Sequence, residues 1–155
     1  FKKVETDGYL FGYIHLGGKI GVLVEFANDF DEAKAQTAKD IAMHIAAINP
    51  EFLDRDSVDS ESIAKEKKIY KEQMLNEGKP EHIIDQIVEG KINKYYTQVC
   101  LLEQPFVRDD DQTVAEVLAE NEMEVKQFTR FEIGEGIEKK EEDFAAEVAA
   151  MTKNQ

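Results

Sequence analysis

The residues best suited to chemistry are dispersed along this chain. Its three histidines, His15, His44 and His82, fall on three different predicted elements. None belongs to an H-E-x-x-H or histidine–cysteine pattern of the kind that binds zinc. The serines between positions 57 and 62 lack the G-x-S-x-G setting of a hydrolase nucleophile. The sequence therefore predicts neither a zinc site nor a catalytic triad.

Two short motifs raise the question of a bound ligand. The run GGKIG, which begins at Gly17, lacks the G-x-x-x-x-G-K-S/T spacing of a phosphate loop. The acidic run Asp109–Asp111 lacks the alternating order and the later bidentate Glu of a calcium loop. We interpret it as a turn whose negative charge favours the N-terminus of the next helix. These patterns predict no metal, no cofactor and no covalent catalysis.

Composition narrows the class of partner. A chain of 155 residues is one domain, or one domain with an appendage, and its net charge is −14. Such an excess of acid argues against direct binding to nucleic acid, which depends on clustered Lys and Arg. No apolar run approaches the roughly 20 residues that cross a membrane. The single cysteine, Cys100, cannot form an internal disulfide, so we expect a reducing, cytoplasmic compartment.

A small antiparallel sheet is the first predicted element. Residues 9–15 and 20–26 each alternate with period two, and Leu16-Gly17-Gly18-Lys19 between them favours a β-hairpin. Residues 125–133 alternate again and are expected to add a third strand. The hairpin supplies His15 at the end of its first strand.

Helices are expected to pack on this sheet. Residues 31–49 have helical periodicity, Asp29 and Glu32 form a candidate capping pair, and Pro50 ends the helix. Further on, QVCLLEQPFV is predicted to be extended, residues 109–112 to turn, and residues 113–122 to form a short helix. The apolar stripe of the first helix consists of Ala38, Ile41, Ala42, Ile45 and Ile48.

Two further helices predict a protruding arm. Residues 60–77 and 80–96 are joined only by Gly78-Lys79, so the helices must run antiparallel. Each apolar stripe is so narrow that it can pack against one neighbouring helix but not against a whole core, as in a coiled coil. The stripes consist of Ile63, Tyr70 and Met74 in the first helix and of Ile83, Ile84, Ile87, Val88 and Ile92 in the second.

The end of the chain predicts a docking element. Residues 143–153 are predicted to form a short helix whose apolar stripe is Phe144, Val148 and Met151. A helix of this length is only marginally stable in water unless its apolar stripe packs against another surface. It either folds back or docks on a partner, and we favour docking. The resulting fold class is α+β, with a small sheet packed by helices, a coiled-coil hairpin and a C-terminal helix. The expected division is 1–58 and 98–134 as core, 59–97 as arm, and 135–155 as linker and C-terminal module.

Several long phrases together resemble one family. These are YIHLGGKIGVLVE, DIAMHIAAINPEFL, NEGKP, IVEGKINKYY, LLEQPFVRDD and RFEIGEGIEKKEEDFAAEVAAM. In this order they resemble elongation factor Ts, the guanine-nucleotide exchange factor of elongation factor Tu. The resemblance covers essentially the whole chain. It implies a translation factor that acts by binding a protein, in a bacterial-type cytoplasm or, alternatively, in a mitochondrion or plastid.

The resemblance also implies contact residues. In the family, the histidine before the GG turn faces elongation factor Tu, which points to His15; the alternative is a partly buried core histidine. The pair after QPF also contacts the partner, and here it is Val107-Arg108, with Arg108 where methionine is common. Near the C-terminus the family's methionine matches Met151, on the stripe shared with Phe144 and Val148.

The resemblance leaves two questions open. The chain begins at Phe1 and ends like long members of the family, so we expect it to be the C-terminal half of such a protein. The family's insertion motif, Thr-Asp-Phe, would then lie outside this chain. In that case the pair Asp29-Phe30 is either a shortened version of the motif or a strand-to-helix turn. We expect the chain to bind elongation factor Tu but to promote little nucleotide exchange. The alternative is a self-association module that forms a homodimer.

Overall fold

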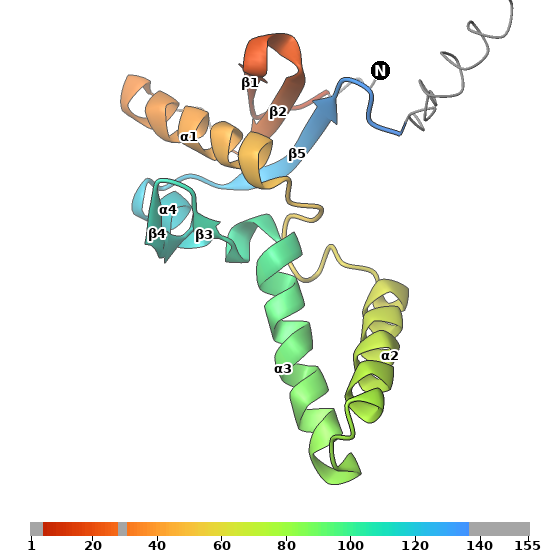
Figure 1. Ribbon diagram of the computed structural model, residues 1–155. Helices are drawn as coiled ribbons and strands as arrows, with labels where there is room; N and C mark the ends of the chain where they lie inside the picture. Colours follow the sequence, from red (N-terminus) through yellow and green to blue (C-terminus); the bar gives the residue numbers. More distant parts are fainter. Residues whose placement is uncertain (1–4, 28–30, 137–155) are drawn as a thin grey trace, which may run out of the picture.

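A three-stranded antiparallel sheet lies toward one end of the molecule (Figure 1). The computed structural model describes residues 5–27 and 31–136. Strands β1 (Tyr9–His15) and β2 (Ile20–Phe26) are the predicted hairpin, and β5 (Val125–Glu132) pairs with the other edge of β2. The turn η1 (Leu16–Gly18) places Gly17 and Gly18 at positive φ, which glycine adopts without strain.

One face of the sheet carries the core. Because strand side chains alternate, Val22, Val24 and Phe26 share a face, and all three are buried. Helix α1 (Glu32–Ile48) packs on this face and fills the space with its own stripe. The α1 stripe is buried at Ala38, Ile41, Ala42, Ile45 and Ala46.

Two details of α1 differ from the sequence prediction. Its N-cap is Asp31, whose carboxylate accepts a hydrogen bond from the backbone N–H of Lys34, so the capping pair built on Asp29 was wrong. The helix begins at Glu32, so the residue before it, Asp31, is the N-cap, and Glu32 stands at N1 and not at the N3 position of a capping pair. Ile48 is 46% exposed, so the buried stripe ends at Ala46, within the last turn. Periodicity gives the buried side of a helix, but not where along the helix its cover stops.

A helical hairpin extends away from the sheet (Figure 1). Helix α2 (Ser60–Asn76) and helix α3 (Glu81–Val99) pack against each other through a narrow row of side chains. Gly78 lies at φ 72° between them, as the short antiparallel connection requires. The fully buried members of the row are Met74, Ile84, Val88 and Ile92.

The segment after α3 departs from the predicted extended run. Helix α3 continues to Val99, three residues beyond the predicted end, because the Cys100 N–H still bonds to the Tyr96 carbonyl. A 3-10 turn, η2 (Leu101–Glu103), follows. Within the predicted run, β3 (Pro105–Phe106) is a strand, and Cys100 and Gln104 on either side of η2 also have extended backbone. Contacts with residues 52 and 53 fold the rest back, since the N–H groups of Leu101 and Leu102 donate to those carbonyls.

A small second sheet and a short helix complete the core. Strand β4 (Asp109–Thr113) pairs with β3, so the predicted turn at residues 109–112 was wrong and the chain reverses at Val107-Arg108 instead. Helix α4 (Val114–Glu120) begins with a capping box between Thr113 and Glu116. In the described part of the chain, no helix has the length and apolar character needed to cross a membrane.

Candidate partner-binding surface

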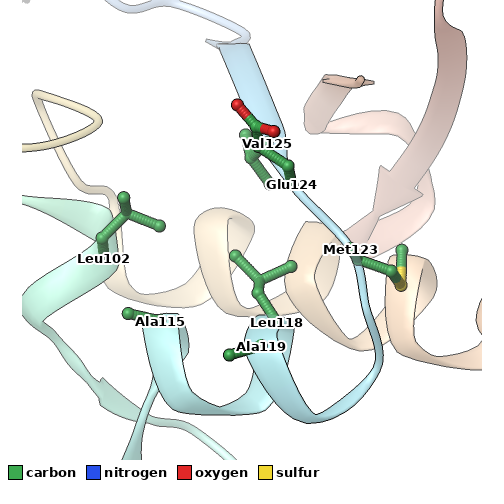
Figure 2. Close-up of a pocket in the computed structure, with 7 residues that line it drawn as sticks. All are labelled: Leu102, Ala115, Leu118, Ala119, Met123, Glu124 and Val125. Carbon is green, nitrogen blue, oxygen red and sulfur yellow. The ribbon is translucent and has the colours of Figure 1, made fainter. Parts of the chain in front are cut away.

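An apolar hollow lies between α4 and the start of β5 (Figure 2). Its lining offers a single carboxylate, that of Glu124, and no second polar side chain beside it. A catalytic or ligand pocket needs several converging polar groups. We therefore interpret the hollow as a packing gap. The lining residues are Leu102, Ala115, Leu118, Ala119, Met123, Glu124 and Val125.

The titratable side chains with shifted pKa values, such as Cys100 and Glu25, take part in packing and hydrogen bonding within the fold. Burial raises the pKa of the Cys100 thiol to about 11, so the thiol stays protonated and unreactive near neutral pH. Hydrogen bonds from Thr6 and then Gln127 lower the pKa of Glu25, which ties the start of the described chain to β2 and β5. Within residues 5–27 and 31–136, no three His, Cys, Asp or Glu side chains gather as a metal site would require.

His15 lies at the end of β1, beside the hairpin turn. The sequence left open whether it faces a partner or belongs to the core. It is half-buried, and its Nδ1 lies 2.9 Å from the Tyr13 hydroxyl. The two rings are tilted at 35° with centroids 5.7 Å apart. His15 is thus held in place by its own strand, while its position at the hairpin end leaves part of the ring open to a partner.

The Val107-Arg108 pair forms the reversal of the β3–β4 hairpin. Val107 is 43% exposed although it is apolar. Arg108 lies beside α1, where its Nη1 contacts both carboxylate oxygens of Asp40 at 2.7 and 2.8 Å. The Arg108 side chain remains 53% exposed and that of Asp40 only 14%. This turn presents an apolar side chain next to a guanidinium that is fixed from one side.

The second face of the main sheet is not covered by α1. Across its three strands, Ile14 stands opposite Gly21, and Gly21 stands opposite Phe131. Ile14 is 69% exposed and Phe131 52% exposed, and Gly21 between them carries no side chain. Leu16 and Ile133, at the same end of the sheet, are 62% and 78% exposed. Together these four apolar residues form what we call the outer-face patch.

The junction between the core and the helical hairpin depends on Arg55. Its Nε and Nη2 donate to the two carboxylate oxygens of Glu103 at 2.5 and 2.7 Å, and its Nη1 donates to Asn93 at 3.1 Å. The guanidinium also lies 4.5 Å from the ring centre of Tyr96. One side chain therefore joins the segment before α2 to the base of α3.

The remaining predicted site residues lie outside the described residues. These are the candidate insertion-motif pair Asp29 and Phe30, and the C-terminal stripe Phe144, Val148 and Met151. Of the sequence-predicted positions, the structure describes His15, Val107 and Arg108. They belong to different parts of the core, His15 to the hairpin of the main sheet and the other two to the turn of the second sheet.

Sequence reasoning missed the residues that support these positions. Asp40 and His44 both reach the Val107-Arg108 turn from α1, and neither was predicted to do so. A signal was present, because His44 interrupts an apolar stripe between Ile41 and Ile45. A polar side chain in such a stripe needs a buried partner. The outer-face patch was also missed, although alternation places Ile14 opposite the covered side of its strand.

Comparison with known proteins gives a consistent result. Residues 1–135 match the family model described as Elongation factor TS. The chain is 65% identical over 148 residues to elongation factor Ts of Halothermothrix orenii, covering 96% of this chain and 50% of that protein. Against that of Desulforamulus reducens it is 49% identical over 162 residues, covering 97% and 75%. Against that of Limosilactobacillus reuteri it is 53% identical over 145 residues, covering 93% and 48%. The chain thus spans from about half to three quarters of the length of these relatives.

Proposed function

The chain belongs to the elongation factor Ts family, and from that membership we propose that it binds elongation factor Tu and contributes to the exchange of GDP for GTP. It acts as a protein ligand, without covalent chemistry. Val107 is the observation that carries this proposal. It is an exposed apolar side chain on a turn whose backbone and neighbouring guanidinium are both fixed to α1. Preorganised apolar anchors of this kind supply much of the affinity of protein interfaces.

Exchange follows from thermodynamic linkage. A protein that binds nucleotide-free elongation factor Tu more tightly than the GDP form lowers the affinity for GDP by the same factor, because coupling is reciprocal. The residues of this chain therefore need only grip their partner. We propose that His15, Val107 and Arg108 provide part of that grip, with Phe144, Val148 and Met151 as a second contact.

The proposal extends to organisation and compartment. Residues 1–58 and 98–134 would act as the core that carries the grip, residues 59–97 as the arm, and residues 135–155 as the C-terminal module. The relatives are bacterial proteins, which supports a bacterial-type cytoplasm. Since the chain spans half of the Halothermothrix protein, we propose that residues 1–155 alone bind elongation factor Tu weakly and accelerate its release of GDP little or not at all.

Titration against nucleotide-free elongation factor Tu tests the grip. We expect Val107→Ala to weaken binding about tenfold, which corresponds to roughly 1.4 kcal/mol. Leu75→Ala is the matched control, because Leu75 is likewise an exposed apolar side chain, at 46%, and lies on α2, away from the turn. Equal affinity of wild type and Val107→Ala would remove the turn from the interface. Absence of binding by wild type would overturn the proposed function.

Release of a fluorescent GDP analogue, followed by stopped flow, tests the division of labour. We expect residues 1–155 to accelerate release far less than a full-length family member does. Rates equal to those of the full-length protein would show that the chain also carries the activity that disturbs the nucleotide site.

The outer-face patch favours a second candidate function, self-association. Exposed apolar patches on soluble domains commonly mark interaction sites. Gly21 between Ile14 and Phe131 would let a second sheet approach closely, as sheet-on-sheet packing at about 10 Å requires. Sedimentation at several concentrations would detect a dimer, and Phe131→Ser should shift it to monomer. A chain that stays monomeric at high micromolar concentration would exclude this alternative.

A further inference from the structure

The Val107-Arg108 turn is poorly specified by its own residues. Phe106 pairs with Asp109, so only two residues connect the strands. Two-residue hairpins favour turns with positive φ, typically Asn-Gly or Gly-containing pairs. Among the described residues, the non-glycine positions with positive φ are Leu16, Asn49 and Glu122. Val107 and Arg108 thus adopt negative φ in a turn that fits strand twist badly, and its conformation must be supported from outside.

Helix α1 supplies that support at two points. The backbone N–H of Val107 donates to Nδ1 of His44 at 3.1 Å. One turn earlier on the same helix, Asp40 accepts from Nη1 of Arg108 through both oxygens. Asp40 is itself steadied by Gln36, whose Nε2 donates to Oδ1 at 2.9 Å. Because Asp40 and His44 are four residues apart, their side chains leave the same side of α1.

The surroundings of His44 fix its proton. A backbone N–H can only donate, so Nδ1 of His44 is the acceptor and Nε2 carries the hydrogen. Nε2 then donates to Oε1 of Gln104 at 2.9 Å, and Nε2 of Gln104 donates to the Gln98 carbonyl at 2.6 Å. The imidazole also stacks on Phe106, with centroids 6.0 Å apart and an angle of 23°. Both ring nitrogens are therefore used, and the ring contacts the strand that leads into the turn.

Packing alone does not explain a histidine here. The side chain is 0% exposed, and an apolar residue of similar size would fill the space without desolvating two nitrogens. Such a residue would instead leave the Val107 N–H and the Gln104 amide oxygen without their present partners. What the imidazole adds over an apolar side chain is a hydrogen bond to the turn and a second one to Gln104.

We propose that His44 is a positioning residue for partner binding. Together with Asp40, it holds the Val107-Arg108 turn in the conformation that presents Val107 to the partner. The contacts with α1 occupy one edge of the Arg108 guanidinium, since within the described residues only its Nη1 has an acceptor. The other edge is left to bind a partner. The partner surface that fits is an apolar depression with an oxygen acceptor at its rim. This inference rests on the proposed function, because it assigns the contact with elongation factor Tu to this turn.

Two substitutions of His44 separate its hydrogen bonds. In His44→Asn, the amide oxygen stands near the place of Nδ1 and can still accept from Val107. In His44→Gln, the amide nitrogen stands near the place of Nε2 and can still donate to Gln104, but the acceptor for Val107 is lost. Both variants lose the stacked ring and are neutral at every pH. They are therefore matched in functional group and charge, and they differ by one methylene in length and in which hydrogen bond remains.

The experiment measures two quantities on residues 1–155. Amide exchange by NMR reports the protection of the Val107 N–H in the free chain. Titration against nucleotide-free elongation factor Tu reports affinity. We expect His44→Asn to retain protection and to bind within about threefold of wild type, and His44→Gln to lose protection and bind about tenfold more weakly. Thermal unfolding of both variants checks that they are folded to a similar extent at the temperature of the titration.

Three results would overturn the inference. Equal affinity of the two variants would show that the Val107 hydrogen bond does not position the turn for binding. Unchanged Val107 protection in His44→Gln would show that the turn holds its conformation without α1. A wild-type chain that fails to bind would refute the proposed function and the inference with it. In the first two results wild type still binds, so they leave the proposed function standing.

Discussion

The core and the helical hairpin bury their apolar side chains in different ways. In the core, the sheet, α1, α4 and the β3 strand all contribute to one continuous cluster. In the hairpin, a single row between α2 and α3 is flanked by exposed ion pairs, Lys67 with Glu89 and Lys71 with Asp85. Lys91 also lies over the Tyr70 ring, with 5.3 Å between its Nζ and the ring centre. The core encloses its apolar residues, whereas the hairpin screens them with long charged side chains.

This difference separates global from local stability. A residue in the core contacts elements that are distant in sequence, so its loss weakens the whole domain. A residue in the hairpin row contacts only the neighbouring helix. Its contacts can therefore break when the hairpin opens locally, while the core stays folded. The candidate partner contacts His15, Val107 and Arg108 are all placed on the core. Binding surfaces benefit from this location, because rigid elements hold their geometry.

The largest expected effect is that of Ile45→Ala in the core. Ile45 is 0% exposed and belongs to the main cluster, so we expect a loss of about 2–5 kcal/mol in the free energy of unfolding. Urea denaturation measures it. Ile48→Ala, the same change three residues later at 46% exposure, should cost less than about 1 kcal/mol. Similar losses in both variants would show that burial on α1 does not govern stability.

Ile84→Ala applies the same substitution to the hairpin. Ile84 is 1% exposed, so the cavity term is comparable and we expect a local cost of about 2–4 kcal/mol. We expect hydrogen exchange to rise in α2 and α3 while the strands keep their protection. On heating, part of the far-ultraviolet circular-dichroism signal of helix should then be lost at a lower temperature than that at which the core unfolds. A parallel loss of protection in β2 would instead make the core and the hairpin one cooperative unit.

Acid should affect the two regions at different pH. Burial lowers the pKa of His44 from 6.5, so the unfolded chain binds a proton that the native core does not. The core should therefore lose stability as the pH falls below 6.5. In the hairpin, hydrogen bonds from Ser62 lower the pKa of Asp59, the N-cap of α2, from 3.8. That contribution is present above 3.8 and is lost only at lower pH.

Urea unfolding at pH 7, 6 and 5, followed by resolved NMR signals from each region, measures this difference. His44→Asn should flatten the dependence of the core over that range, because an amide does not titrate. The hairpin signals should show little change in either protein. A core whose stability is constant from pH 7 to pH 5 would contradict the assignment of His44 as a buried neutral imidazole.

Elements defined by local pattern could be predicted from the sequence. The strand alternation, the Gly17-Gly18 turn and the Gly78 connection each depend on nearby residues, and the structure confirms them. Predictions failed where distant contacts decide. QVCLLEQPFV has no local reason to fold as helix and 3-10 turn, but backbone bonds to residues 52 and 53 hold it there. The same applies to the chain reversal, which lies at Val107 instead of the acidic run.

The candidate site shows the same limit. Val107 and Arg108 were named through a family resemblance, and their exposure in the structure is compatible with a contact role. Their support by Asp40 and His44 joins residues more than 60 positions apart, and no periodicity predicts it. His44 could be recognised as unusual from its place in an apolar stripe, but its partner could not. Pairing across the fold had to come from the structure.

The smallest expected effect concerns Arg55, the residue that joins the two regions. Its contacts are strong in geometry, but the side chain is 47% exposed and that of Glu103 26% exposed, so solvent screens the pair. We expect Arg55→Ala to cost about 1 kcal/mol of global stability, from a screened ion pair and one cation–π contact. Its larger consequence should be geometric. Without the fork to Glu103 and the bond to Asn93, the base of α3 keeps only backbone bonds and apolar packing to the segment before α2.

Spin labels at Glu77, near the hairpin end, and at Lys39 on α1 would report this change as a distance distribution. We expect a single narrow distribution in the otherwise unaltered chain and a broader one in Arg55→Ala. Arg55→Lys keeps the charge but lacks the planar fork, so it should resemble the alanine variant more than the parent. If Lys restored the narrow distribution, charge alone would orient the hairpin. If neither variant broadened it, the backbone bonds from residues 51 and 52 to Val99 would be sufficient to hold the two regions together.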